Sequence, residues 1–168
     1  MAAAIREGKI EDYLNWVEVA PGDTFFIPAG TLHAIGSGIL IAEIQQNSDI
    51  TYRVYDYGRL GLDGKPRALH VEKAVEVTDT TAVVGQERAD IDDGVCCDFF
   101  ETYRVTLTGE PKKIDIDPKR FELLICVDGE GTLDGAICKA GDSYLIPATA
   151  GQVVVDGHMT LLQSHVNL

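Results

Sequence analysis

Basic residues are scarce in this chain of 168 residues, because 14 Lys and Arg stand against 27 Asp and Glu, a formal net charge of −13. Non-specific binding to nucleic acid depends on neutralising phosphates, and a chain this acidic is therefore not expected to bind nucleic acid in that way. The same charge disfavours docking on anionic membrane surfaces. A local group of arginines could still bind a small anionic substrate. We therefore expect no nucleic-acid partner and no membrane partner.

Long apolar runs are also lacking. The longest lies near residues 39–42 and is ended by Glu43, far short of the ~20 residues that a membrane-spanning helix needs. The first seven residues lack the apolar stretch of a signal peptide. Cysteines number only four, and the adjacent Cys96 and Cys97 match neither a zinc-knuckle spacing nor a common disulfide framework. We expect reduced thiols and a cytoplasmic location.

What the chain does contain is many short apolar segments separated by turn residues. Helices are expected at residues 3–15 and 71–77, and an acidic linker at 78–94. In the second half, Asp-Gly pairs punctuate alternating segments, which predicts an antiparallel sandwich or barrel. The expected strands are residues 24–28, 39–46, 50–57, 99–108, 114–116, 122–127, 131–137, 143–146, 152–155 and 160–164.

An internal repeat decides the expected architecture. Residues 21–29 read PGDTFFIPA and residues 140–148 read AGDSYLIPA, so a Gly-Asp turn, a strand and a Pro-Ala bend recur. The pattern is typical of a cupin-type jelly roll. A full set of strand segments precedes the second copy, whereas only the expected helix precedes the first. We therefore expect a mainly β fold with short helices, one partial barrel and one complete small barrel.

The corresponding domains are expected at residues 1–77, which would form part of a catalytic cupin barrel with a leading helix, and at 95–168, which would form a second, metal-free cupin barrel. The difference in metal content rests on one position. His33 stands five residues after Pro28 in the first copy, and Gln152 stands at the same offset in the second. A histidine at the barrel rim can ligate a divalent metal, or it can be an ordinary rim histidine.

Two further residues near His33 carry candidate chemistry. A turn at residues 36–38 would place Glu43 on the same face of a hairpin, where its carboxylate could act as a general base. The alternative for Glu43 is an exposed residue of a strand. Arg53 could clamp a phosphate or a developing oxyanion. It could equally form a structural ion pair with Asp49 or Asp56.

Residues 21–35, 42–59 and 69–74 resemble the zinc-dependent type I mannose-6-phosphate isomerases in their short bacterial form. The resemblance implies two cupin barrels and the interconversion of mannose 6-phosphate and fructose 6-phosphate through an enediol. It places His33 on the last zinc ligand of that family and Arg53 on its active-site arginine. It places Glu43 on a carboxylate that lines the site. A sugar phosphate is then the expected substrate and Zn²⁺ the expected cofactor.

The chain departs from that family before His33, because no histidine precedes it and the other zinc-ligand motifs are missing. We therefore expect the C-terminal part of such an enzyme, with an incomplete zinc site and exposed strand edges through which copies could associate. Whether Met1 is the native start is left open. One alternative is a non-catalytic cupin module that binds a sugar or a protein. A metal cupin of other chemistry, such as a dioxygenase, would need a His/Glu-rich first motif that is absent.

Overall fold

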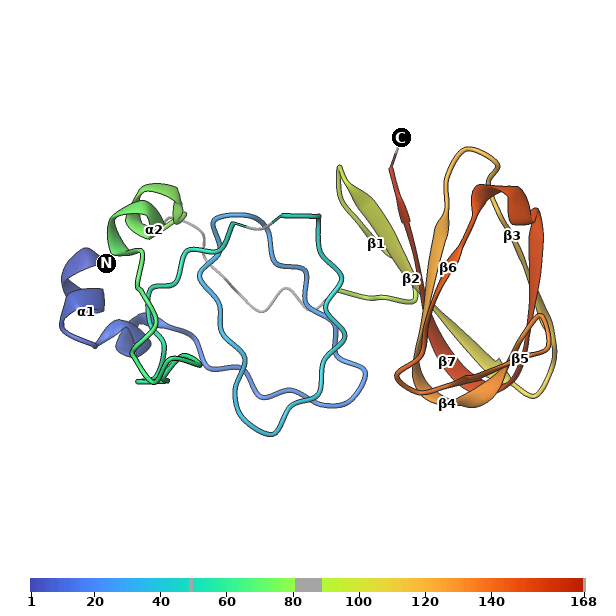
Figure 1. The fold of residues 1–168 in the computed structure, drawn as a ribbon, viewed down its shortest axis with the longest axis horizontal. Coiled ribbons are helices and arrows are strands. Elements are labelled where there is room, and N and C mark those ends of the chain that lie inside the picture. The colour runs from blue at the N-terminus through green and yellow to red at the C-terminus, as the bar shows by residue number, and fades with distance from the viewer. Residues whose placement is uncertain (49, 81–88, 168) are drawn as a thin grey trace. The chain divides into compact units, whose positions relative to one another are not determined.

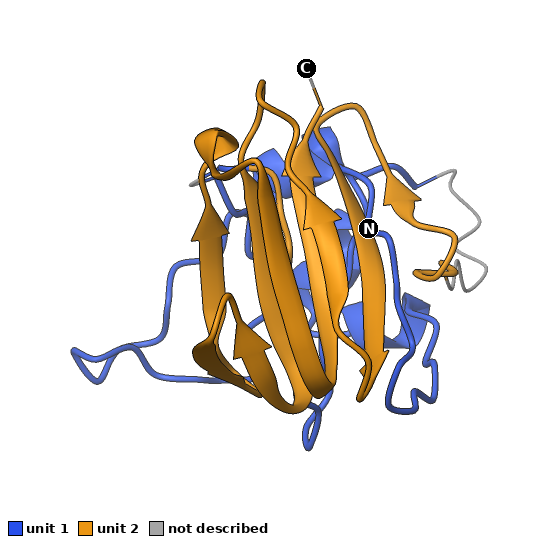
Figure 2. Cartoon of the chain, turned by 90° about the vertical axis from the view of Figure 1, so that its right-hand side faces the viewer, with its two compact units in different colours: residues 1–40, 47–87 blue, residues 41–46, 88–168 orange. Residues whose placement is uncertain are grey.

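The computed structural model describes residues 1–48, 50–80 and 89–167. They fall into two compact units (Figure 2). Unit 1 comprises residues 1–40 and 47–87, and unit 2 comprises residues 41–46 and 88–168. The expected linker at 78–94 lies partly outside the described residues. No helix among the described residues is long and apolar enough to cross a bilayer.

Unit 1 contains short helices and extended loops (Figure 1). The expected helix at 3–15 is divided into α1 (Ala2–Arg6) and a 3-10 helix (Ile10–Tyr13), because Gly8 between them has a φ of 68°. Helix α2 (Val71–Val77) forms as expected. A small core joins the helices to the loops, and an ion pair of 3.0 Å connects Arg6 to Glu72. The buried core residues are Ala4, Ile5, Ile10, Val54 and Ala74.

The strands expected at residues 24–28, 39–46 and 50–57 are wrong. Residues 24–28 contain one bridge residue, Phe25, and no described residue of 39–46 or 50–57 belongs to a strand. The hairpin expected around Ser37 is likewise not formed by the described residues. An extended segment becomes a strand only when a neighbouring strand receives its N–H and C=O hydrogen bonds. The alternating patterns of 39–46 and 50–57 therefore stay extended without a ladder.

Unit 2 contains a sheet in which every pairing is antiparallel. The two longest strands are central, since β7 lies between β4 and the pair β2 and β3, and β4 lies between β7 and the pair β5 and β6. The outer strands of the two sides are not paired within the described residues, so hydrogen bonds do not close the expected barrel. The strands are β1 (Val95–Cys96), β2 (Phe100–Thr108), β3 (Lys112–Asp115), β4 (Glu122–Leu133), β5 (Ala136–Lys139), β6 (Ser143–Ile146) and β7 (Gln152–Val166), with a 3-10 helix at Ala148–Ala150.

Two of the expected Asp-Gly turns lie inside strands. Residues 128–129 follow a bulge in β4 between Cys126 and Asp128, and residues 156–157 continue β7. A bulge takes up one extra residue without ending the pairing. The third pair, Asp134 and Gly135, does form a hairpin turn between β4 and β5, with φ values of 47° and 81°.

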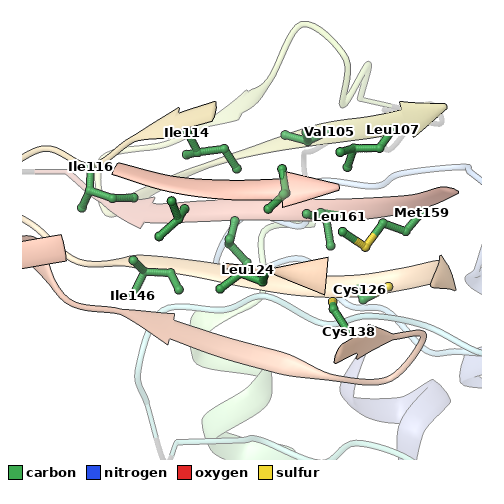
Figure 3. Packing of buried hydrophobic residues seen from close by; sticks show 13 residues of the cluster. Val105, Leu107, Ile114, Ile116, Leu124, Cys126, Cys138, Ile146, Met159 and Leu161 are labelled. Carbon is green, nitrogen blue, oxygen red and sulfur yellow. The ribbon is translucent and has the colours of Figure 1, made fainter. Parts of the chain in front are cut away.

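The core of unit 2 is apolar throughout (Figure 3). Among its members Cys126 and Cys138 are free thiols that are almost fully buried, and burial raises the pKa of Cys126 to about 11. The thiol of Cys126 is therefore protonated and unreactive at neutral pH. The buried members are Val105, Leu107, Ile114, Ile116, Leu124, Cys126, Leu133, Cys138, Ile146, Val153, Val155, Met159 and Leu161.

We predict that Gly157→Ala destabilises unit 2 because β4 and β7 approach closely at this glycine. An added Cβ would lie 2.5 Å from the Cα of Gly131 and 2.7 Å from the carbonyl oxygen of Glu130. Overpacking against backbone should lower the free energy of unfolding by about 2–3 kcal/mol. Gly135→Ala is the matched control, since its φ is also positive but its Cβ would meet open space. Urea unfolding should show a clearly smaller loss there, about 1 kcal/mol.

Candidate functional site

His33 and Arg53 both belong to unit 1, whereas Glu43 belongs to the segment 41–46 that clusters with unit 2. Glu43 is exposed, and no hairpin places it on one face with His33. His33 lines a small cavity of about 40 Å³ together with residues adjacent to Arg53 in the sequence. The other lining residues are Ile10, Leu14, Leu32, Ala34, Val54, Tyr55 and Tyr57. The structure thus brings the loop of His33 against the segment of Arg53.

A hydrogen bond to the backbone orients the ring of His33. Its Nδ1 lies 2.9 Å from the carbonyl oxygen of Thr31, and because a carbonyl can only accept, Nδ1 donates. Nε2 then carries the lone pair and is available to a ligand, the arrangement usual in metal-binding histidines. A catalytic zinc ion needs about three protein ligands. The described residues contain no group of three His, Cys, Asp or Glu side chains that could hold a metal. His33 fits the ion, but the described set does not complete a site.

Arg53 is half-buried, and its backbone is fixed by His70. The amide of Arg53 donates to Nδ1 of His70 at 3.1 Å, and the amide of His70 donates to the carbonyl of Arg53 at 2.8 Å. His70 also precedes α2 as its N-cap residue. Nothing in the sequence shows this pairing across 17 residues. His70 is therefore a positioning residue for Arg53.

Three arginines surround one carboxylate in unit 1. Arg67 binds Asp56 through both of its oxygens, and Nε of Arg53 lies 3.7 Å from Oδ1 of the same residue. The guanidinium of Arg59 lies 5.7 Å from the centroid of the Tyr57 ring. The hydrogen bonds from Arg67, with the nearby charges of Arg53 and Arg59, hold the pKa of Asp56 below its ordinary value.

This arginine cluster (Arg53, Arg59 and Arg67) has two consequences. Arg53 and Arg67 contact Asp56, and the charge of Arg59 also acts on it, in a chain whose overall charge is −13. A local group of arginines of this kind is able to attract an anion even where the whole chain is acidic. The ion pair between Arg53 and Asp56 is one of the alternatives that the sequence left open, and the structure contains it. Arg59 and Arg67 were missed, since their approach to Asp56 depends on the fold of the loop.

Gln152, the counterpart of His33 in the repeat, begins β7 in unit 2. Its amide nitrogen donates to Oδ1 of Asp115 at 2.7 Å. The second copy of the repeat contains β6 and the 3-10 helix at Ala148–Ala150, whereas the first copy is an extended loop. The side chain of Gln152 is thus engaged in pairing β7 with β3.

Comparisons with known proteins agree with this fold. Residues 91–166 match the family model "Mannose-6-phosphate isomerase, cupin domain". The chain is 35% identical to the mannose-6-phosphate isomerase ManA of Bacillus subtilis, over 99% of this chain and 56% of that protein. It is 33% identical to the mannose-6-phosphate isomerase of Streptococcus mutans, over 97% of this chain and 54% of that protein. The chain thus spans a little over half the length of these curated relatives.

Solved structures show the same likeness. The mannose 6-phosphate isomerase of Bacillus subtilis superposes with a TM-score of 0.80 at 34% identity, covering 97% of this chain and 55% of that one. A putative mannosephosphate isomerase from Archaeoglobus fulgidus superposes with a TM-score of 0.52 at 21% identity, over 59% of this chain and 34% of that one, which supports the fold alone. The mainly β cupin fold expected from the sequence is confirmed. The chain is therefore similar to mannose-6-phosphate isomerases over nearly its whole length, and its residues 91–166 match the cupin-domain model of that family.

Proposed function

We propose that this chain supplies part of the active site of a mannose-6-phosphate isomerase, which interconverts mannose 6-phosphate and fructose 6-phosphate through an enediol. The observation that carries the proposal is the arginine cluster of unit 1, where Arg53 and Arg67 contact the same carboxylate and Arg53 is fixed through its backbone. Likeness to isomerases over nearly the whole chain supports it. A sugar phosphate supplies the anion that such a cluster attracts.

The roles of the chain's own residues follow from their chemistry. Arg53 is permanently charged and donates in a fixed fork, so it is suited to hold substrate oxygens and to offset negative charge on the enediolate. Glu43 is the proposed proton carrier between the adjacent carbons. His33 is the proposed ligand of a zinc ion whose further ligands lie outside the described residues. When bound, such an ion would polarise the oxygen atoms of the substrate as a Lewis acid.

Association of this chain with a second copy is a further part of the proposal. Exposed apolar side chains accompany the extended segments 39–46 and 50–57, and such surface favours association. Leu40 is 99% exposed, and Ile39, Ile41 and Ile50 are also exposed. A cytoplasmic location fits an enzyme of sugar-phosphate metabolism.

One observation favours a second candidate, a non-catalytic cupin module that binds a sugar or a protein. Within the described part of the chain, no three-ligand group is present near His33. Such a module would fold without metal. It would not turn over mannose 6-phosphate, even when joined to the part of its longer relatives that it does not cover.

The test is mannose 6-phosphate turnover by two proteins. One is this chain alone, and the other is a chimera in which the part of Bacillus subtilis ManA that this chain does not cover is joined to it. We expect almost no turnover from the chain alone, since His33 by itself cannot hold zinc tightly, and measurable turnover with bound zinc from the chimera. Turnover by the chain alone with bound zinc would show that a ligand set has been overlooked. A folded but inactive chimera would favour the binding module.

A further inference from the structure

Tyr57 is an aromatic residue at a backbone position that glycine, asparagine or aspartate ordinarily occupies. The amide of Arg59 donates to the carbonyl oxygen of Asp56 at 2.9 Å. Between them, Tyr57 and Gly58 have φ values of 52° and 67°. Two consecutive positive φ values are the pattern of a type I′ turn, where Gly, Asn and Asp predominate because a larger side chain crowds the backbone. Among the described residues only one other non-glycine residue has a positive φ, and it is an aspartate, Asp134.

The packing of unit 1 does not account for a tyrosine in this strained turn. Tyr57 is 46% exposed, so it is not a core residue. Its ring packs against that of Tyr55 with a centroid distance of 4.8 Å, and no hydrogen bond joins its hydroxyl to another described residue. An asparagine would form the same turn with less strain. The reason for a tyrosine is therefore to be sought in what the ring and its hydroxyl contact.

The ring of Tyr57 borders on both parts of the candidate site. It lines the cavity of about 40 Å³ together with His33. The guanidinium of Arg59, a member of the arginine cluster, lies 5.7 Å from the ring centroid, which is within the range of a cation–π contact. The cavity itself holds only molecules of about the size of water. A larger ligand would lie against the exposed part of the ring, beside the arginine cluster.

We propose that Tyr57 is a specificity-determining residue, which selects a sugar phosphate over phosphate alone. The proposal rests on the proposed function for the class of its ligand. The guanidinium groups of the arginine cluster bind the phosphate. The hydroxyl of Tyr57 forms a hydrogen bond with a hydroxyl of the sugar, and the ring packs against its carbon atoms. Backbone strain of this kind persists mainly at sites where the side chain serves a function.

The first test is an NMR titration of the full chain with mannose 6-phosphate and, separately, with inorganic phosphate, followed at the amides of residues 56–59. We expect the wild type to bind mannose 6-phosphate more tightly than phosphate. Tyr57→Phe should weaken the binding of mannose 6-phosphate about fivefold, the effect of one lost hydrogen bond, and leave that of phosphate unchanged. Tyr13→Phe, at a tyrosine of unit 1 that is 75% exposed, is the matched control and should bind both as the wild type. A wild type without preference for mannose 6-phosphate, or a Tyr57→Phe variant that binds it equally well, would overturn the proposal.

The second test uses Tyr57→Asn, which supplies a residue that the turn prefers. Exchange of the Arg59 amide should be as slow as in the wild type or slower, which would show that the turn is kept. Binding of mannose 6-phosphate should nevertheless weaken at least about tenfold, because the ring and its hydroxyl are both lost. If phosphate binding weakened by the same factor, Tyr57 would act only through Arg59 and the proposed selectivity would be wrong.

The chimera separates this proposal from the proposed function. In an active chimera, Tyr57→Phe should raise KM for mannose 6-phosphate about fivefold and leave kcat nearly unchanged, since the lost contact is made equally in the bound substrate and in the transition state. An unchanged KM would overturn the role of Tyr57 and leave the isomerase function standing. An inactive chimera, with the selective binding by the chain intact, would remove the isomerase function and support the role of Tyr57.

Discussion

His33→Ala in the chimera is expected to remove bound zinc and mannose 6-phosphate turnover together. Nε2 of His33 is the ring atom that the Thr31 hydrogen bond leaves available, and a catalytic zinc ion held by about three protein ligands does not tolerate the loss of one. Turnover should fall by more than about 100-fold, since even residues that only orient a ligand change metal affinity or activity by about 10–100-fold. Zinc analysis of the purified protein and an isomerase assay measure both effects.

The matched control for this variant is His158→Ala, at an exposed histidine of unit 2. It should keep both zinc and turnover, because it removes an imidazole without touching the proposed ligand. A His33→Ala chimera that retains stoichiometric zinc would show that His33 is an ordinary rim histidine, the alternative that the sequence left open.

Arg53→Ala in the chimera is expected to lose turnover but, unlike His33→Ala, to retain bound zinc. Arg53 is assigned to substrate and not to metal, and the loss of one donor that stabilises a developing oxyanion typically costs about 100- to 1,000-fold in kcat. The assay and the zinc analysis on the chimera again separate the two effects. His70 binds the backbone of residue 53 and not its side chain, so the substitution should remove the guanidinium without moving the backbone.

Arg104→Ala is the corresponding control, since Arg104 binds Asp92 with two hydrogen bonds in unit 2, outside the arginine cluster. We expect it to affect stability and to leave kcat close to that of the unchanged chimera. Full activity of the Arg53→Ala chimera would remove the proposed role of Arg53 and reduce its contact with Asp56 to a structural ion pair.

Unit 2 could be predicted in large part because its signals are local. The strand expected at residues 143–146 forms with the same bounds, and the Asp134-Gly135 turn joins two paired strands. The errors are equally local in origin. Asp-Gly pairs at 128–129 and 156–157 have the composition of turns, yet a bulge and a close crossing of two glycines let β4 and β7 continue through them.

The first 57 residues were predicted less well, because whether their extended segments become strands depends on neighbouring strands that are distant in the sequence. Residues 39–46 and 50–57 have the alternation of half-buried strands, but a strand also needs a neighbour, and the described residues provide none for them. For the site, the motif around His33 and Arg53 was visible in the sequence. His70, which pairs with Arg53, lies 17 residues beyond it, and Arg67, which shares Asp56 with Arg53, lies 14 residues beyond it. Only the folded loop brings them there.

We propose that the sheet of unit 2 folds by itself, whereas the segments around His33, Glu43 and Arg53 are an open part of an isomerase site. Amide hydrogen exchange on the chain alone and on the chimera tests it most directly, with size-exclusion chromatography to report association. We expect slow exchange in β2, β4 and β7 in both proteins. Most amides of 39–46 and 50–57 should exchange rapidly in the chain alone and slowly in the chimera, where strands can pair with them. Slow exchange of these segments in a compact monomer of the chain alone would contradict the account.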